Sequence, residues 1–314
     1  MVGSLSRLIE RLLRRAVCTQ SRHDITTQVD ADALSGCGNI TGLINIQSGS
    51  LTSLTLNGIQ RLDGSLDISF CPALAQISAP QLEWINHNLT LSSLPLLTNL
   101  SLPSLETVVD RVSWASLPLL TRPTLKTVGT DELGNPGTNI YGDLTIQNCG
   151  FQSLEFFNFG TFARAGDIVV EGNSQMSKIN LSSLVYSTAL NIENNGPDLR
   201  VYLPKLSSVG NLQLKHVAEL HFPNLMTMDG VLILDENYFG PFELPQLSSI
   251  GGDVFVWNNA HMSAFNLPAL TKIGGGIYDG DFRIANNSAL TTITGLPLLN
   301  FVDGNTSLSG NFDT

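Results

Sequence analysis

Short alternations of apolar and polar residues recur along most of the chain. In the segment 254–259, the apolar Val254 and Val256 alternate with Phe255 and Trp257. The same spacing of two apolar residues occurs in Leu66/Ile68, Leu89/Leu91, Leu144/Ile146, Ile168/Val170, Leu190/Ile192, Leu212/Leu214, Leu232/Leu234 and Phe282/Ile284. Because alternate residues of a strand point to opposite faces, this pattern predicts short strands with one buried face.

One residue follows each predicted strand at a fixed distance, three residues after the second apolar residue, and we call it the corner position. Consecutive corner positions are mostly about 22 to 24 residues apart. They are Gly49, Cys71, Leu94, Leu117, Cys149, Asn173, Asn195, Val217, Asn237, Asn259, Asn287 and Asn311. A repeat of this length is typical of a solenoid, in which stacked coils bury the faces that one coil leaves open. We therefore expect an all-β fold, a β-solenoid of about twelve coils of 20–24 residues.

A second motif, Leu-Pro-x-Leu-x-x-Ile/Val, follows the corner position by about nine residues, as in 102–108. Proline has no N–H to donate to a sheet, so the motif predicts a bend. Two glycine-rich inserts, 129–140 and 274–279, lengthen their coils just before a strand and are predicted to be exposed loops. No low-complexity linker interrupts the repeats, so 18–314 is predicted to form a single domain with an N-terminal cap.

Residues 1–17 differ from the repeats. Leucines at helical spacing face Arg7, Arg11, Arg14 and Arg15, and these charges interrupt the apolar run that a secretory signal requires. The segment is either a basic amphipathic targeting helix or an incomplete or misplaced start of the chain. In both cases it is predicted to lie outside the fold.

The overall composition narrows the class of partners. Charged residues make up 14% of the 314 residues, and the formal net charge is −11. No nucleic acid and no anionic membrane surface is expected as a partner, because phosphate groups attract lysine and arginine. No apolar run approaches the roughly 18 residues of a membrane span.

The repeated pattern Leu-x-x-Ile/Val-x-Gly-x-Leu-x-Ile-x-x-Asn, preceded by Cys18 and by Leu-Ser-Gly-Cys at 34–37, resembles a known family. It is similar to the receptor L-domain-like, leucine-rich-repeat-like proteins of the fungal cell wall, the GPI-anchored cell-wall organisation (sporulation-specific-like) family. The resemblance covers the chain from about residue 18 to its end. It implies an extracellular glycoprotein of the wall or outer plasma membrane that supports wall integrity without catalysis. The chain shows neither a clear signal peptide nor a GPI signal, so a membrane contact through such an anchor is implied by the family only.

The four cysteines fall into two pairs. Cys18 and Cys37 lie close in sequence where an open solenoid end needs covering, and a disulfide between them is expected to stabilise the cap by about 3 kcal/mol. Cys71 and Cys149 occupy corner positions three coils apart, about 14 Å, which is too far for a disulfide. We expect buried thiols that replace the corner asparagine.

The acidic and histidine side chains offer no catalytic set. Asp143, Asp167, Asp253 and Asp281 follow glycines, where aspartate commonly forms Asx turns. The alternatives are a calcium site or the acids of a polysaccharide hydrolase or lyase, which need two carboxyl groups close together. The corner asparagines are expected to bond backbone groups. The histidines lack metal-ligand spacing and no Gly-x-Ser-x-Gly motif occurs, so we predict no catalytic residues, no metal and no cofactor.

Six Asn-x-Ser/Thr sequons are candidates for N-glycosylation. Asn99 and Asn180 precede the Leu-Pro-type stretch, where an exposed corner is expected, and Asn88 stands immediately before a strand. The complete set is Asn39, Asn88, Asn99, Asn180, Asn286 and Asn305.

The outward residues of the repeated strands provide one candidate binding face. Phe255 and Trp257 are two apart on one strand and share a face, and neighbouring coils are expected to place Asp235 and Arg283 beside them. Flat aromatic rings with polar neighbours suit the apolar face of a sugar. The alternative is that a neighbouring segment, such as 274–279 with Tyr278, folds over the rings.

These features favour a non-catalytic extracellular protein that supports fungal cell-wall organisation and contacts wall polysaccharide or wall proteins. The first alternative is a receptor-like ectodomain that binds a glycan or a protein through the face around Trp257. The second is a β-helix enzyme that acts on polysaccharides.

Overall fold

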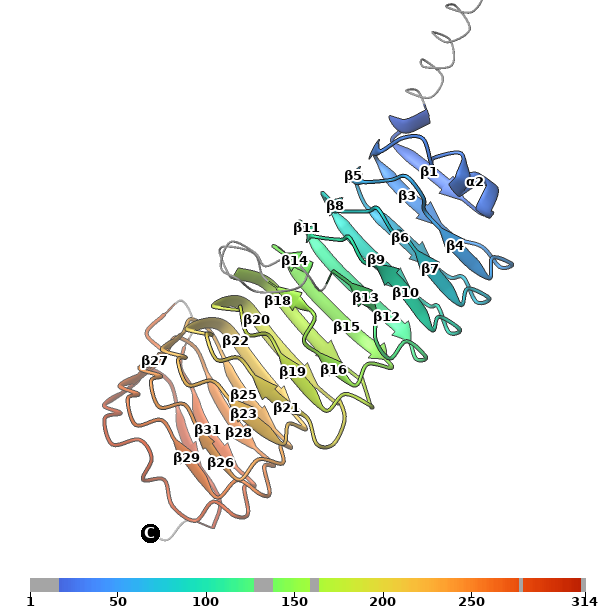
Figure 1. Cartoon of the computed structure of the whole chain (residues 1–314). Coiled ribbons are helices and arrows are strands. Elements are labelled where there is room, and N and C mark those ends of the chain that lie inside the picture. The colour runs from blue at the N-terminus through green and yellow to red at the C-terminus, as the bar shows by residue number, and fades with distance from the viewer. Residues whose placement is uncertain (1–16, 127–137, 159–163, 277–278, 312–314) are drawn as a thin grey trace, which may run out of the picture. The chain divides into compact units, whose positions relative to one another are not determined.

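The computed structural model describes residues 17–126, 138–158, 164–276 and 279–311. They belong to two compact units, one ending at Phe151 and the other beginning at Gln152, and each is described by itself. Short parallel strands make up nearly all of the regular structure (Figure 1), so the predicted all-β solenoid of about twelve coils is confirmed. The single domain over 18–314 stays a prediction. Residues 1–16, most of the insert 129–140, and residues 277 and 278 lie outside the described ranges.

Three parallel sheets, which we call walls A, B and C, enclose the first unit, and each coil from β3 to β14 adds one strand to each wall. Wall A contains β1 (Arg22–Ile25), β3 (Leu43–Ile46), β6 (Leu66–Ser69), β9 (Asn88–Ser92), β12 (Arg111–Leu117) and β15 (Asp143–Cys149). Of these, β6, β9 and β15 carry the predicted apolar pairs. Wall B follows the corner position and contains β4 (Ser53–Thr55), β7 (Gln76–Ser78), β10 (Asn99–Leu102) and β13 (Thr124–Leu125). Wall C leads back to wall A through β2 (Asn39–Thr41), β5 (Arg61–Asp63), β8 (Trp84–Ile85), β11 (Thr107–Val108) and β14 (Thr138–Ile140).

The second unit repeats these walls. Wall A contains β18 (Arg164–Glu171), β20 (Tyr186–Glu193), β22 (Ser208–Lys215), β25 (Leu232–Asp235), β28 (Val254–Trp257), β31 (Phe282–Ala285) and β33 (Thr306–Leu308). Wall B contains β16 (Ser153–Leu154), β19 (Lys178–Asn180), β21 (Arg200–Tyr202), β23 (Glu219–His221), β26 (Pro241–Glu243) and β29 (Ala264–Asn266). Wall C contains β24 (Thr227–Met228), β27 (Ser249–Ile250), β30 (Lys272–Ile273) and β32 (Phe301–Val302), which here belong to the same sheet as wall A because β24 pairs with the beginning of β22. β17 (Phe157–Asn158) is a further short strand.

The predicted apolar pairs form the core of each unit. Every one of these side chains is at most 3% exposed. The strands are in register, so that Leu66 pairs with Leu89, and Leu232 with Val254. Two further buried pairs were not among those predicted: Ile44 and Ile46 in β3, and Val112 and Trp114 in β12. The Trp114 ring lies 5.8 Å from that of Phe151. Burial of stacked apolar rows is the main favourable term for such a fold.

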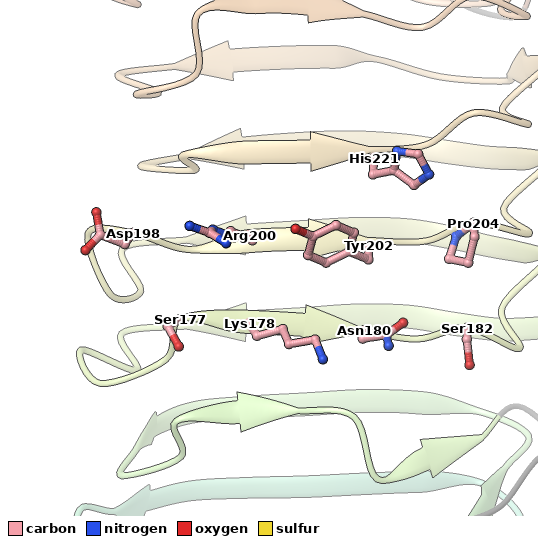
Figure 2. Close-up of a pocket in the computed structure, with 9 residues that line it drawn as sticks. All are labelled: Ser177, Lys178, Asn180, Ser182, Asp198, Arg200, Tyr202, Pro204 and His221. Atoms are coloured by element: carbon pink, nitrogen blue, oxygen red, sulfur yellow. The ribbon is translucent and has the colours of Figure 1, made fainter.

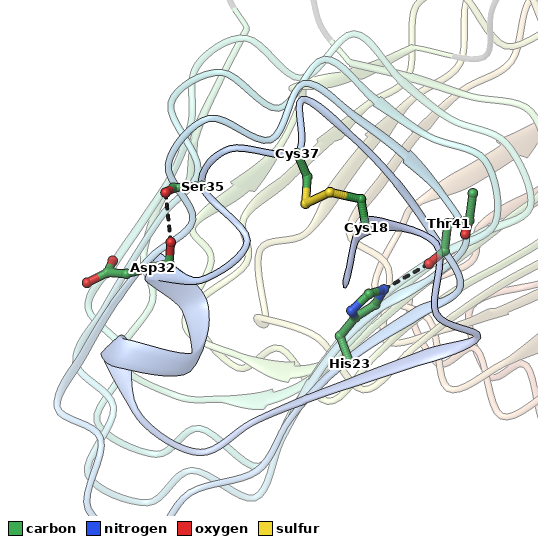
Figure 3. Close-up of a disulfide and its surroundings, with 6 residues drawn as sticks. All are labelled: Cys18, His23, Asp32, Ser35, Cys37 and Thr41. Carbon is green, nitrogen blue, oxygen red and sulfur yellow. Dashed lines mark hydrogen bonds between the residues drawn. A yellow bond between two sulfur atoms is a disulfide. The ribbon is translucent and has the colours of Figure 1, made fainter. Parts of the chain in front are cut away.

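A cap covers the beginning of the first unit. The predicted disulfide between Cys18 and Cys37 is present (Figure 3). The short helix α2 (Gln28–Asp32) starts with Thr27 and Asp30 in a capping box. Backbone N–H donors of Thr26 and Thr27 are the main reason that the pKa of Asp30 is lowered to about 2. Within the described residues, no helix is long and apolar enough to span a membrane.

The corner positions connect successive coils through side-chain hydrogen bonds. In the second unit, Asn259 Oδ1 accepts from the backbone N of Asn237 at 2.9 Å, and its Nδ2 donates to the carbonyl of Leu234 at 3.0 Å. Asn287 bonds to Asn259 in the same way. The exposed Asn311 donates instead to the carbonyl of Ser288.

A thiol takes the place of asparagine in the first unit. The backbone N of Ser48 donates to Cys71 Sγ at 3.3 Å, and the thiol lies 3.7 Å from the carbonyl of Ile46. Cys71 and Cys149 are buried and unpaired with each other, as expected. Burial raises the pKa of Cys149 to about 12, so this thiol is a structural and unreactive group.

The residue just before the corner position has a left-handed backbone. This holds from the second corner to the eleventh, with φ between 51° and 69°, at Phe70, Ser93, Ser116, Asn148, Gly172, Asn194, His216, Glu236, Asn258 and Asn286. The left-handed residue turns the chain from wall A into wall B. Such a φ is unfavourable for most L-residues, and asparagine and glycine tolerate it best.

We predict that Asn259→Ala lowers the free energy of unfolding by about 2–3 kcal/mol, because the buried backbone groups of two coils lose their partners. Asn259→Cys should lose less, since a thiol fills this role at Cys71. Urea denaturation followed by circular dichroism measures the change. Asn266→Ala is the control, because its amide bonds to the side chain of Glu243 on the surface. Equal stability of the Asn259→Ala and Asn266→Ala variants would contradict the role of the corner asparagines.

We also predict that Phe70→Asn stabilises the protein by about 0.5–1 kcal/mol, because asparagine tolerates the left-handed backbone better. The Phe70 side chain is 67% exposed, so little burial is lost. Phe70→Ala, which keeps a Cβ and the strain, is the control and should give no gain. A denaturation midpoint of Phe70→Asn at or below that of Phe70→Ala would show that the φ of residue 70 carries no cost.

Candidate functional site

The four residues predicted to form a binding face lie together on wall A of the second unit. The strand register places Ile233, Phe255 and Arg283 in one outward column. The next column contains Asp235, Trp257 and Ala285. The face therefore arises from three successive coils, β25, β28 and β31, whose inward side chains are buried.

The two aromatic rings form a stacked pair. The ring centroids of Phe255 and Trp257 are 5.2 Å apart and their planes are inclined by 25°. The guanidinium carbon of Arg283 lies 5.7 Å from the centre of the Phe255 ring. Both rings are half-buried, and so is Ile233 beside them. The result is a flat apolar strip with an exposed cation at its border.

Charged groups border the strip on the other side. Lys215 Nζ lies 3.0 Å from Asp235 Oδ2 and 2.9 Å from Glu236 Oε2. Hydrogen bonds to Glu236 and then to Asp235 raise the pKa of Lys215. The second oxygen of Asp235 accepts from Asn258 Nδ2 at 3.0 Å. Both carboxylates thus serve as partners of one ammonium group, which differs from the acid and nucleophile pair of a glycosidase.

The predicted covering segment is described only in part. In 274–279, residues 277 and 278 lie outside the described ranges, and Tyr278 is one of them. Gly275 N donates to Asp303 Oδ2 at 3.2 Å, which ties the described glycines to the final coils.

The aspartates that follow the glycines bond to neighbouring coils. The Asx-turn prediction is wrong for Asp253 and Asp281. Asp253 Oδ1 accepts from the backbone N of Asp281 at 2.8 Å, and Asp281 Oδ1 accepts from the backbone N of Asn305 at 2.8 Å. This second bond is the main reason that the pKa of Asp281 is lowered. Asp143 instead accepts from Arg111 Nη2 at 2.7 Å. Among the described residues, no group of three or more His, Cys, Asp or Glu side chains is arranged to hold a metal ion.

A groove on wall B of the second unit was not foreseen. Its volume is about 820 Å³, and it crosses β19, β21 and β23 (Figure 2). It is lined by Ser177, Lys178, Asn180, Ser182, Asp198, Arg200, Tyr202, Pro204 and His221. The sequence did contain a signal for this groove. Lys178 and Arg200 both lie five residues after a corner asparagine, and Asn180 and Tyr202 both lie seven residues after one, so each pair is expected to be adjacent in neighbouring coils.

The six sequons occupy different environments. Asn99 and Asn180 lie in strands β10 and β19, so the predicted placement at a corner is wrong. Asn88 is the first residue of β9, and Asn39 is the first of β2. Two others use their amides: Asn286 Nδ2 donates to Asn258 Oδ1 at 3.2 Å, and Asn305 Nδ2 donates to Asp281 Oδ1 at 3.3 Å.

Comparison with known proteins finds relatives on fungal cell surfaces. A cell surface GPI-anchored protein of Arthroderma benhamiae is 32% identical over 291 residues, which cover 92% of this chain and 70% of that protein. Protein ecm33 of Aspergillus fumigatus is 33% identical over 246 residues, 75% of this chain and 56% of the relative. Sporulation-specific protein 22 of Saccharomyces cerevisiae is 25% identical over 297 residues, 94% of this chain and 61% of the relative. The chain thus spans 56% to 70% of the length of these relatives. No family model and no solved structure matches it.

We predict that the ring pair contributes little to the stability of the fold. Trp257→Ser should lower the free energy of unfolding by about 1 kcal/mol, whereas Val256→Ser, one residue away in the core, should lower it by about 3 kcal/mol. Denaturant titration of both variants measures the difference. A loss at Trp257 as large as that at Val256 would show that the ring belongs to the core.

Proposed function

Since the chain belongs to the family of fungal GPI-anchored cell-surface proteins, we propose that it is a non-catalytic protein that supports the organisation of the cell wall. A location at the cell surface follows from these relatives. Attachment to the wall or to the outer face of the plasma membrane through a glycolipid anchor is part of the proposal.

We propose further that wall A of the second unit binds wall polysaccharide. The observation that carries this is the stacked pair of Phe255 and Trp257, half-buried in a face whose other side chains are mostly small or polar. The apolar face of a pyranose packs on flat aromatic rings. Its hydroxyl groups then meet the carboxylate of Asp235 and the guanidinium of Arg283, which lie beside the rings in register.

The arrangement of charges favours binding over hydrolysis. Cleavage of a glycosidic bond needs one carboxylic acid that carries a proton and a second carboxylate about 5–10 Å away. Asp235 is occupied by Lys215 and Asn258, and Glu236 by Lys215 and His216. These contacts fix side chains that orient a bound sugar.

A repeated surface suits a polymeric ligand. Successive coils of a parallel solenoid are about 4.8 Å apart, so columns of side chains present regularly spaced groups to an extended chain. The rigid core beneath β25, β28 and β31 holds these groups without a loss of conformational freedom on binding.

We predict that Trp257→Ala weakens binding to insoluble wall glucan, chitin or mannan about fivefold, because one ring–sugar contact is worth roughly 1 kcal/mol. Co-sedimentation of the purified secreted protein with each polymer measures the affinity. Phe255→Ala should lose a similar factor.

The matched control is Trp84→Ala. Trp84 is a half-buried tryptophan on wall C of the first unit, with the Arg61 guanidinium carbon 4.7 Å from its ring centre. It should leave binding unchanged. Unchanged binding in Trp257→Ala would refute this assignment of the site. Binding of a wall protein, in place of a polymer, that is lost in Trp257→Ala would favour the receptor-like alternative.

A further inference from the structure

The groove on wall B of the second unit joins side chains of three coils. The register aligns Lys178 with Arg200 and Glu219, and Asn180 with Tyr202 and His221. Figure 2 shows Tyr202 on the strand between Asn180 and His221. Neighbouring strands of a sheet are about 4.8 Å apart, so the Tyr202 ring is the nearest large surface to the Asn180 side chain along this column.

The two cations that line the groove are each paired with a carboxylate outside the lining, and Asp198 is a further acidic group of the lining. Lys178 Nζ lies 2.8 Å from Glu155 Oε2, and Arg200 Nε lies 3.4 Å from Glu219 Oε2. The groove therefore offers many hydrogen-bonding groups but no unpaired cation for a phosphate or a carboxylate. This chemistry suits a neutral, hydroxyl-rich ligand.

The Tyr202 ring is held in place. Its hydroxyl donates to Glu219 Oε1 at 3.1 Å, and its centroid lies 6.1 Å from that of His221. The ring is half-buried, so it presents a fixed apolar surface at the floor of the groove. Fixed aromatic rings of this kind pack on sugar rings.

The groove contains its own glycan acceptor. In the sequon Asn180-Leu181-Ser182, Leu181 is buried while Asn180 and Ser182 both line the groove. The Asn180 amide makes no hydrogen bond to any residue that the structure describes, unlike the amides of Asn286 and Asn305. Within the described residues, Asn39, Asn88 and Asn99 share the unengaged amide, but at Asn180 it stands in register with the held ring of Tyr202 inside a groove.

We propose that Asn180 carries an N-linked glycan and that the first sugars of this glycan lie in the groove on the ring of Tyr202. The donor is an oligosaccharide linked to a lipid diphosphate, encountered by the extended chain during secretion. Asn180 Nδ2 forms a bond to the anomeric carbon of the first sugar and loses a proton to a base. The bond from that carbon to the diphosphate oxygen breaks, and the lipid diphosphate leaves with the electron pair. On folding, the glycan settles on β21 and β23.

This inference concerns a different wall from the proposed polymer-binding face and depends only on passage through the secretory pathway. The groove has a volume of about 820 Å³ and is open to solvent, so a glycan that begins in it can continue outward. The groove is thereby filled by sugar that belongs to the protein itself. Wall polysaccharide then binds to wall A, as proposed above.

Glycopeptide mass spectrometry of the full chain secreted from a fungal host tests occupancy. The expected result is a glycan at Asn180 in the wild type and none in Ser182→Ala, which removes the acceptor sequence and keeps Asn180. An unmodified Asn180 in the secreted wild type would overturn the proposal.

Enzymatic release of the glycan from the folded protein tests whether its first sugars pack on the ring of Tyr202. A sugar packed on Tyr202 should be released about tenfold more slowly by an amidase or endoglycosidase in the wild type than in Tyr202→Ala. Tyr202→Phe, which keeps the ring and loses the hydrogen bond to Glu219, should remain slow. The glycan at Asn99, if present, serves as an internal control and should be released equally fast in all variants.

Equal release rates at Asn180 in the wild type and Tyr202→Ala would overturn the seating. If Tyr202→Ala fails to fold, a fast release in folded Tyr202→Phe overturns it instead, and a slow one supports it. These measurements use no wall polymer, so a failure of polysaccharide binding at Trp257 leaves them unaffected.

Discussion

A coil of this protein cannot bury its own apolar side chains, and every other feature depends on that constraint. Each coil offers one strip of leucine, isoleucine or valine from wall A, and only the coils before and after it exclude water from the strip. Stacking requires parallel strands in register. The register in turn fixes which side chain of one coil stands beside which side chain of the next.

The turn between walls A and B is the structurally demanding part of the coil. A left-handed residue, such as Glu236 or Asn258, reverses the chain, and the next residue turns inward. That inward residue satisfies backbone groups of the neighbouring coil, through an amide at Asn259 and through a thiol at Cys71. Two chemically different side chains thus meet one requirement, namely that buried N–H and C=O groups find partners.

The same register produces the surface sites. The face around the ring pair on wall A and the groove on wall B both combine residues of successive coils that are distant in sequence. Charges on these faces are paired between coils, as in Lys215 with Asp235 or Arg200 with Glu219. Pairing leaves faces rich in hydrogen-bonding groups and aromatic rings, and the proposed contacts with sugars rest on these groups.

The sequence by itself determined the repeat, the buried pairs, the corner asparagines and the Cys18–Cys37 bridge, because a period of two within strands and one near 22 between coils is written directly in the residue types. It also placed Asp235 and Arg283 beside Phe255 and Trp257, since alignment of the coils on their corner positions implies the register. The left-handed backbone at Phe70 was decided only by the tertiary structure, because neither phenylalanine nor its neighbours favour that conformation locally. The bonds of Asp253 and Asp281 to the next coil and the groove around Tyr202 were decided in the same way. Their existence depends on which backbone N–H or side chain the adjacent coil presents, and that is a property of the stack rather than of any one repeat.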